Sequence, residues 1–256
     1  MMRAILEIAK LSFADAIRNK VAYGVFTFLL LLLATASALA SVTMGRTELM
    51  IMDLGLGGIS ILGNLMAIIL TIQSLQQERE SRTLYVLITR LQGRWKYLVG
   101  KFLGLAAVLS IQIIMMCLIL SGCIAIFGHI FWLSFVQACI STLFEIYIVI
   151  AIALLFAQSS SLFLAILLTL AVDIAGRFTF VIQQLGEQSD STLVQTFTQG
   201  MYYLLPNLEA INLRNQAGYV ANIPWHELIS MMTYSISEIV FILLIAAFIF
   251  GRKNLA

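Results

Sequence analysis

A long apolar run near the N-terminus sets the class of protein to which this chain can belong. Residues 21–42 contain no charged side chain, and a helix needs roughly 20 apolar residues to cross a bilayer core. Because 61% of all residues are hydrophobic and only 11% are charged, a water-soluble domain could not cover its surface with polar groups. Five further apolar runs lie at 54–72, 102–127, 135–156, 162–181 and 228–250. The sequence therefore predicts an all-α integral membrane protein with six transmembrane helices.

The segments outside these runs complete one predicted transmembrane domain, 1–256. Residues 1–20 mix charged and apolar side chains at helical spacing, which predicts an amphipathic elbow helix in the membrane interface. The charged segment 75–101 forms the loop between the second and third runs. In the polar segment 183–227, apolar residues recur at helical spacing from Leu193 to Leu204. We expect that stretch to form an amphipathic helix on the outer surface of the membrane.

The basic residues are distributed unevenly between the two predicted sides of the membrane. One side has only Arg46, Arg177 and Arg214. The other side has Arg3, Lys10, Arg18, Lys20, Arg79, Arg82, Arg90, Arg94, Lys96, Lys101, Arg252 and Lys253. Because Lys-rich and Arg-rich loops stay in the cytoplasm, we expect both termini to be cytoplasmic and the chain to lie in the inner (plasma) membrane.

The loop after the second run has a pattern of its own, with charges at its start and apolar residues on one helical face. The residues concerned are Glu78, Glu80, Arg82, Thr83, Leu84, Leu87 and Ile88. The pattern predicts a short helix along the cytoplasmic surface, with its acidic residues where the helix dipole favours them. From residue types alone, an ordinary basic and aromatic hairpin is an equal alternative.

The stretch QERESRTLYVLITRLQGRWKYLVGKFLG in this loop resembles the first cytoplasmic loop of ABC-2-type permeases, the membrane subunits of ATP-driven transporters. The residues in register are Glu80, Thr83-Leu84, Leu87, Arg94, Tyr97 and Gly100-Lys101. The chain departs from the family at Ser81-Arg82, where Gly commonly precedes Thr, and at Leu91-Gln92, where Pro is common. Among these permeases, the chain is most similar to the group that serves the maturation of multi-copper enzymes such as nitrous-oxide reductase.

The resemblance implies partners and a mechanism. Two permease subunits pair in this family, so we expect a homodimer, and each subunit docks on a cytoplasmic ABC ATPase through the loop helix, called the coupling helix. ATP and Mg²⁺ would bind the ATPase, since this chain has no Gly-x-x-x-x-Gly-Lys-Ser/Thr motif. The chain itself is then a non-catalytic subunit, without metal ligands or nucleic-acid partners and surrounded by lipid. Its substrate would be lipid-like or hydrophobic, or its transport would serve maturation of a periplasmic enzyme.

Polar side chains inside the apolar runs mark a candidate translocation path at Asn64, Glu145 and Glu238. A carboxylate in hydrocarbon costs about 2.5–3.5 kcal/mol, so such a group usually faces protein or water. The two carboxylates could line a path, or they could be protonated or hydrogen-bonded between helices for packing alone. Asp173 and Arg177 lie one turn apart and are expected to form a structural pair.

Two alternatives to transport follow from the same residues. An intramembrane enzyme could use Glu145 and Glu238 if they met around a water or a metal, and a membrane scaffold could recruit soluble factors through the basic loop.

The glycines of the second run and the three cysteines are interpreted as structural residues. The glycines of the second run, Gly55, Gly57, Gly58 and Gly63, favour close helix contact, and the cysteines Cys117, Cys123 and Cys139 suit small buried hydrophobes.

Overall fold

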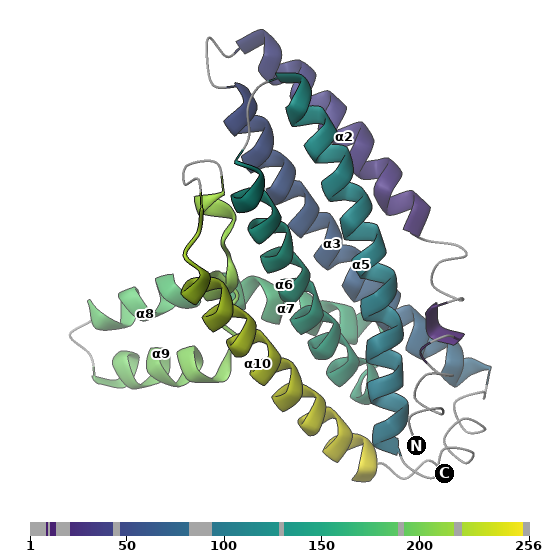
Figure 1. Cartoon of the computed structure of the whole chain (residues 1–256). Coiled ribbons are helices and arrows are strands. Elements are labelled where there is room, and N and C mark those ends of the chain that lie inside the picture. The colour runs from purple at the N-terminus through teal and green to yellow at the C-terminus, as the bar shows by residue number, and fades with distance from the viewer. Residues whose placement is uncertain are drawn as a thin grey trace.

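The computed structural model describes residues 9, 11–13, 21–42, 47–81, 94–127, 131–188, 192–217 and 222–252. In these residues every regular element is helical, as predicted. An elongated bundle (Figure 1) is formed by α2 (Val21–Val42), α3 (Thr47–Glu80), α5 (Arg94–Phe127), α6 (Trp132–Ser159) and α10 (Trp225–Arg252). We call the end of the bundle where α3 ends and α5 begins the loop end.

Four of the described helices are long and apolar enough to cross a membrane, namely Leu49–Glu80, Trp95–Ala125, Trp132–Ser159 and Trp225–Arg252. Helix α2 has 22 residues, and its described side chains include the apolar stretch Gly24–Thr35. Helix α7 (Leu162–Arg177) has only 16 residues, fewer than the roughly 20 that span a bilayer core. The multi-pass architecture is therefore present, and the count of six crossings stays a prediction.

The predicted fifth crossing, 162–181, is wrong at its far boundary, because α7 ends at Arg177. The Phe178 N–H donates to the Ala175 carbonyl at 3.1 Å, three residues back, which is tighter than an α-helical turn. The Gly176 carbonyl accepts instead from the Leu208 N–H at 3.1 Å. A Cβ at Gly176 would lie 2.7 Å from the Pro206 carbonyl oxygen, so the glycine permits this close approach. The segment after α9 thus stops the helix.

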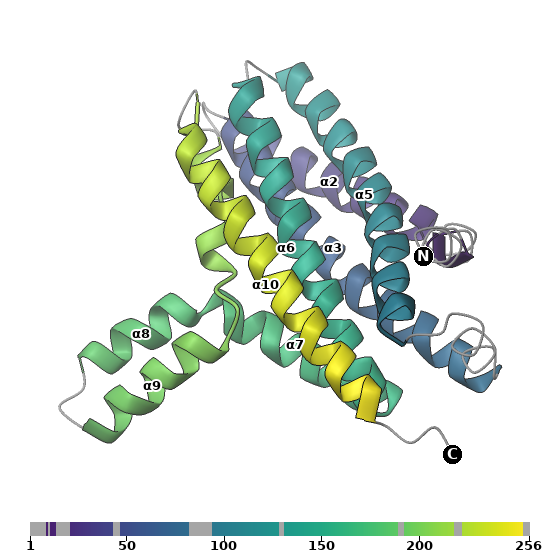
Figure 2. The same cartoon turned by 60° about the horizontal axis from the view of Figure 1, so that its bottom comes forward.

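Two short helices, α8 (Thr179–Glu187) and α9 (Thr192–Leu204), follow as a hairpin that projects sideways from the bundle (Figures 1 and 2). Helix α9 coincides with the amphipathic helix predicted in the polar segment 183–227. The chain then returns through two 3₁₀ turns, η1 (Glu209–Ile211) and η2 (Arg214–Gln216), to α10. The location of α9 on the membrane surface stays a prediction.

Helix α6 is the central element of the bundle, in contact with α3, α5, α7 and α10 (Figure 2). From Ile148 to Leu154 every residue of α6 is buried, as expected of a helix that is apolar on all sides. Helix α3 packs against α6 closely at Gly63, where a Cβ would lie 2.7 Å from Ile146 Cδ1 and 2.9 Å from Ile113 Cδ1. This close packing fixes how the polar residues of α3 face α6.

The glycines of α3 differ in what surrounds them. A Cβ at Gly55 would overlap the Leu120 side chain, so the prediction of close helix contact is confirmed at Gly55 and Gly63. Gly58 is at ordinary contact distance from Phe28. A Cβ at Gly57 would meet no atom within 4 Å, so the prediction is wrong there, and Gly57 borders open space instead.

Candidate functional site

One face of α3 carries polar residues from one end of the bundle to the other. At 3.6 residues per turn they fall within about 60° of one another around the helix axis. The residues of this polar face are Asp53, Ser60, Asn64, Thr71 and Glu78, with Gly57 among them. The face meets two groups of charged side chains, one near the middle of α3 and one at the loop end.

The middle group, which we call the charge cluster, is centred on Glu145 of α6, whose side chain is 3% exposed. Arg177 Nη2 lies 2.5 Å from Glu145 Oε1, and Arg214 Nη2 lies 3.4 Å from Glu145 Oε2. From α3, Ser60 Oγ donates to Glu145 at 3.0 Å and Asn64 Nδ2 donates to it at 2.9 Å. Four elements, α3, α6, α7 and η2, thus meet at one buried carboxylate.

Asp173 completes the charge cluster. Its Oδ2 accepts from Arg177 Nε at 3.5 Å, which confirms the predicted pair, and its Oδ1 accepts from Asn64 Nδ2 at 3.4 Å. The cluster then contains two carboxylates and two guanidinium groups, and these charges balance. Buried charges are tolerated when they are paired and hydrogen-bonded in this way.

The third residue of the candidate path, Glu238, lies elsewhere. It is half-buried on α10, one turn from Tyr234, whose hydroxyl accepts from the Asn207 N–H at 2.9 Å. The structure therefore brings Asn64 and Glu145 together, and Glu238 is not among the partners of Glu145 in the residues described. An intramembrane enzyme that uses both carboxylates has no support from this arrangement.

The second group, which we call the loop-end clamp, consists of Glu78, Tyr97, Lys101 and Phe250. Lys101 is fully buried, and its Nζ lies 2.5 Å from Glu78 Oε1. The Tyr97 hydroxyl donates to the other carboxylate oxygen, Glu78 Oε2, and the Tyr97 ring stacks on Phe250 with centroids 6.1 Å apart. The clamp ties the end of α3 to the start of α5 and the end of α10.

The predicted ATPase-coupling residues divide at this point. Glu78 and Glu80 lie in the last turn of α3, so the prediction that they begin a separate loop helix is wrong. Glu78 points into the clamp, whereas Glu80 is exposed and accepts from Gln76 Nε2 at 3.1 Å. The other five, Arg82, Thr83, Leu84, Leu87 and Ile88, lie outside the described residues. The clamp therefore sits at the root of the segment 82–93 that joins α3 to α5.

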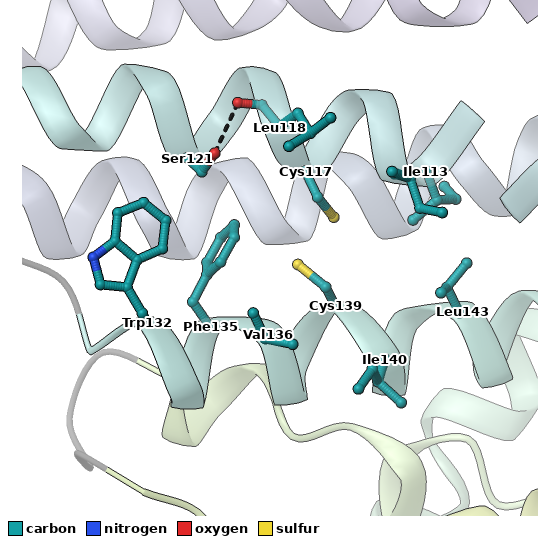
Figure 3. A pocket seen from close by; sticks show the side chains of 11 residues that line it. Ile113, Cys117, Leu118, Ser121, Trp132, Phe135, Val136, Cys139, Ile140 and Leu143 are labelled. Atoms are coloured by element: carbon teal, nitrogen blue, oxygen red, sulfur yellow. Dashed lines mark hydrogen bonds between the residues drawn. The ribbon is translucent and has the colours of Figure 1, made fainter. Parts of the chain in front are cut away.

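Two cavities of different character open beside these groups. A polar cavity of ≈ 480 Å³ is lined by Asp53, Gly57, Asn212, Arg214 and Asn215, and it reaches the charge cluster through Arg214. An apolar cavity of ≈ 310 Å³ lies between α5 and α6, where Cys117 and Cys139 point toward each other (Figure 3). Within the described ranges, no group of three His, Cys, Asp or Glu side chains could hold a metal ion.

Sequence reasoning missed several members of both groups. The spacing of Ser60 and Asn64, four residues apart, was a usable signal that one face of α3 is polar. The sequence places Arg214 in the outer loop and Lys101 in the basic loop, and it does not show that each side chain turns inward onto a carboxylate.

Comparison with known proteins decides the class of protein. A family model described as an ABC-2 family transporter protein matches residues 6–255. The chain belongs to the ABC-2 transporter family. No curated protein matches the chain significantly. The chain is therefore a multi-pass permease component of an ABC transporter, a family whose members work with cytoplasmic ABC ATPase subunits.

In this permease, the two polar groups lie at different distances from the segment 82–93. The loop-end clamp is directly at its root, whereas Asn64 of the charge cluster is about 21 Å further along α3 at 1.5 Å per residue. Both groups are attached to one continuous helix of 34 residues. A displacement of the loop end along α3 would therefore reach the charge cluster.

Proposed function

We propose that this permease couples ATP hydrolysis by a separate ATPase to movement of a lipid-like or hydrophobic substrate, or to maturation of a periplasmic enzyme. It works as a homodimer in the inner membrane, with both termini in the cytoplasm and with ATP and Mg²⁺ bound by the ATPase. Support comes from the family match over nearly the whole chain. The structural observation that carries the proposal is the loop-end clamp.

The clamp supports this proposal because it would let a displacement of one loop move several helices together. The segment 82–93 is the coupling element, and the clamp fastens α3, α5 and α10 to one another at its root. Lys101 is fully buried, so breaking its pair with Glu78 would leave an uncompensated charge, which is costly. A stiff root of this kind passes a displacement on, whereas a flexible one would absorb it.

The test is ATP hydrolysis by the co-purified complex of permease and ATPase, relative to the isolated ATPase. Lys101→Met removes the clamp cation, and we expect the effect of the permease on hydrolysis to fall at least tenfold while the subunits still copurify. Lys96→Met is the matched control, because it removes a half-buried ammonium group from the same end of α5 and Lys96 is not one of the four clamp residues. Hydrolysis that is indifferent to Lys101→Met would refute the coupling role.

A further inference from the structure

Glu238 is the member of the candidate path that lies outside the charge cluster, at the middle of the 28 residues of α10. We propose that Glu238 binds the charged group of a lipophilic organic cation, a hydrophobic molecule that carries a quaternary ammonium, a phosphonium or a similar group. The inference rests on the proposed function, because it names the charge of the hydrophobic substrate that this permease would handle.

The Glu238 carboxylate differs from those of the two polar groups in having no cation beside it. The charge cluster and the loop-end clamp pair their carboxylates with Arg or Lys side chains at 2.5–3.5 Å. Glu238 makes no hydrogen bond or ion pair with a described residue, and the neighbouring Ser237 hydroxyl donates to the Tyr234 carbonyl at 2.7 Å instead. Because a carboxylate inside a membrane is costly without a partner, Glu238 offers a negative charge that an incoming cation would neutralise.

The surroundings of Glu238 favour a cation that is itself hydrophobic. In the apolar stretch of α10, 28% of the residues are buried inside the bundle, against 56–61% in the other three membrane-length helices. Near Glu238 on this helix, Val240 is 51% exposed and Leu244 is 64% exposed. A ligand that reaches the half-buried carboxylate from the lipid phase therefore meets apolar side chains around it, and burial of its own apolar groups against them is favourable.

Two aromatic residues share the helix face of Glu238. Tyr234 lies four residues before it and Phe241 three residues after it, so the three residues form one stripe along α10. The Tyr234 hydroxyl accepts from the Asn207 N–H at 2.9 Å, which holds that side chain in place, and Phe241 is 60% exposed. Since the faces of aromatic rings attract cations, the stripe combines a carboxylate with two groups that suit a large, weakly hydrated cation.

A metal cation suits the stripe less well. Ca²⁺ and Mg²⁺ bind through about six or more oxygen atoms, and in the described ranges no group of three His, Cys, Asp or Glu side chains could supply them. An organic cation needs no such shell of ligands, because its charge is already surrounded by carbon-bound groups. The single carboxylate and the exposed aromatic ring are enough to bind it.

The test is equilibrium binding to the purified full-length permease in detergent, without ATPase. Because it needs no coupling, its failure is distinguishable from failure of the proposed function. The probes are tetraphenylphosphonium and tetraphenylborate, which match in size and shape and differ in the sign of their charge. We expect the phosphonium to bind about tenfold more tightly or better, as one carboxylate in partly desolvated surroundings would achieve. Equal affinities, tighter binding of the borate, or no binding of the phosphonium would overturn the proposal.

Three variants assign the site. Glu238→Gln keeps the shape of the side chain without its charge, and it should abolish the preference for the phosphonium. Glu227→Gln is the matched control, because it removes a carboxylate near the start of the same helix that already accepts from Gln216 Nε2 at 3.4 Å, and it should leave both affinities unchanged. Phe241→Leu should weaken phosphonium binding about threefold and leave borate binding unchanged, which keeps the proposal testable if Glu238→Gln fails to fold.

Two results with these variants would overturn the site. Phosphonium binding that is undiminished in Glu238→Gln would place the cation elsewhere. An equal loss in Glu227→Gln would mean that the overall charge of the permease, and not Glu238, attracts the cation.

Discussion

The charge cluster and the loop-end clamp lie on the same face of one helix and are built differently. In the cluster, Glu145 has four partners from three other elements, two of them guanidinium groups at unequal distances of 2.5 Å and 3.4 Å. In the clamp, one buried ammonium pairs with one carboxylate at 2.5 Å, and a tyrosine completes the contact.

This difference suggests different uses of buried charge. A carboxylate with several partners can exchange one hydrogen bond or ion pair for another and still keep a partner. The elements around it can therefore shift relative to one another. In the clamp the lysine is fully buried, so breaking its pair with Glu78 is costly and the elements it joins move together. We infer that the clamp transmits displacement and that the cluster is where α3, α6, α7 and η2 rearrange.

The largest expected effect on stability comes from removing Glu145, the carboxylate at the centre of the charge cluster. Glu145→Leu leaves two guanidinium groups without their shared carboxylate, and we expect a loss of roughly 3–5 kcal/mol in stability. Glu238→Leu is the matched control, because it removes a half-buried carboxylate from another apolar helix, where no ion pair is formed with a described residue. Thermal unfolding in detergent measures both variants. Equal shifts in the unfolding temperatures of the two variants would show that the contacts of Glu145 do not contribute specially to stability.

The clamp should respond less strongly, because the Glu78 side chain is 17% exposed and can reach water when its partner is removed. Lys101→Met should cost about 1–3 kcal/mol, the usual penalty for a group left without its partner. The exchanged pair Glu78→Lys with Lys101→Glu should recover part of that loss, with a coupling of about 0.5–3 kcal/mol in a double-mutant cycle. If the stability changes of the two single variants simply added up in the double variant, that result would argue against a direct Glu78–Lys101 pair.

The bundle could be predicted from sequence because its signals are local. The uncharged run 21–42 coincides with α2, and the runs at 102–127 and 228–250 lie inside α5 and α10. Helix α7 departs from prediction because a tertiary hydrogen bond from Leu208, distant in sequence, takes the Gly176 carbonyl. No local pattern reports such a contact.

The site was predictable only in part, for the same reason. Asn64 and Glu145 stood out because polar groups inside apolar runs are costly, and Asp173 and Arg177 because they are one turn apart. Arg214 joins the cluster from a segment about 70 residues after Glu145 in the sequence. Partners of this kind depend on how the chain returns between α9 and α10, which residue spacing does not encode.

A smaller effect separates two glycines on either side of the charge cluster. Gly63→Ala places a methyl group 2.7 Å from Ile146 Cδ1 and should cost about 1–3 kcal/mol through overpacking. Gly57→Ala enters open space, so the better helix propensity of alanine should stabilise the protein by up to about 1 kcal/mol. Opposite signs in the two melting shifts are the expected result. A loss at Gly57 as large as that at Gly63 would mean that the polar cavity is filled.

The smallest expected effect concerns α5 and α6 in the half of the bundle away from the loop end. Cys117 and Cys139 point toward each other across the apolar cavity (Figure 3), so a mild copper–phenanthroline oxidation should join them and block both from maleimide labelling in the unfolded chain. Cys123→Ser should leave the link intact, and Cys139→Ser should abolish it.

If the clamp transmits displacement through α3, locking α5 to α6 at this point should change ATP hydrolysis by the complex less than about twofold, since neither clamp nor cluster is touched. Strong inhibition by the link would mean that α5 and α6 must separate during the cycle, and the cluster could then no longer be the only place where the bundle rearranges.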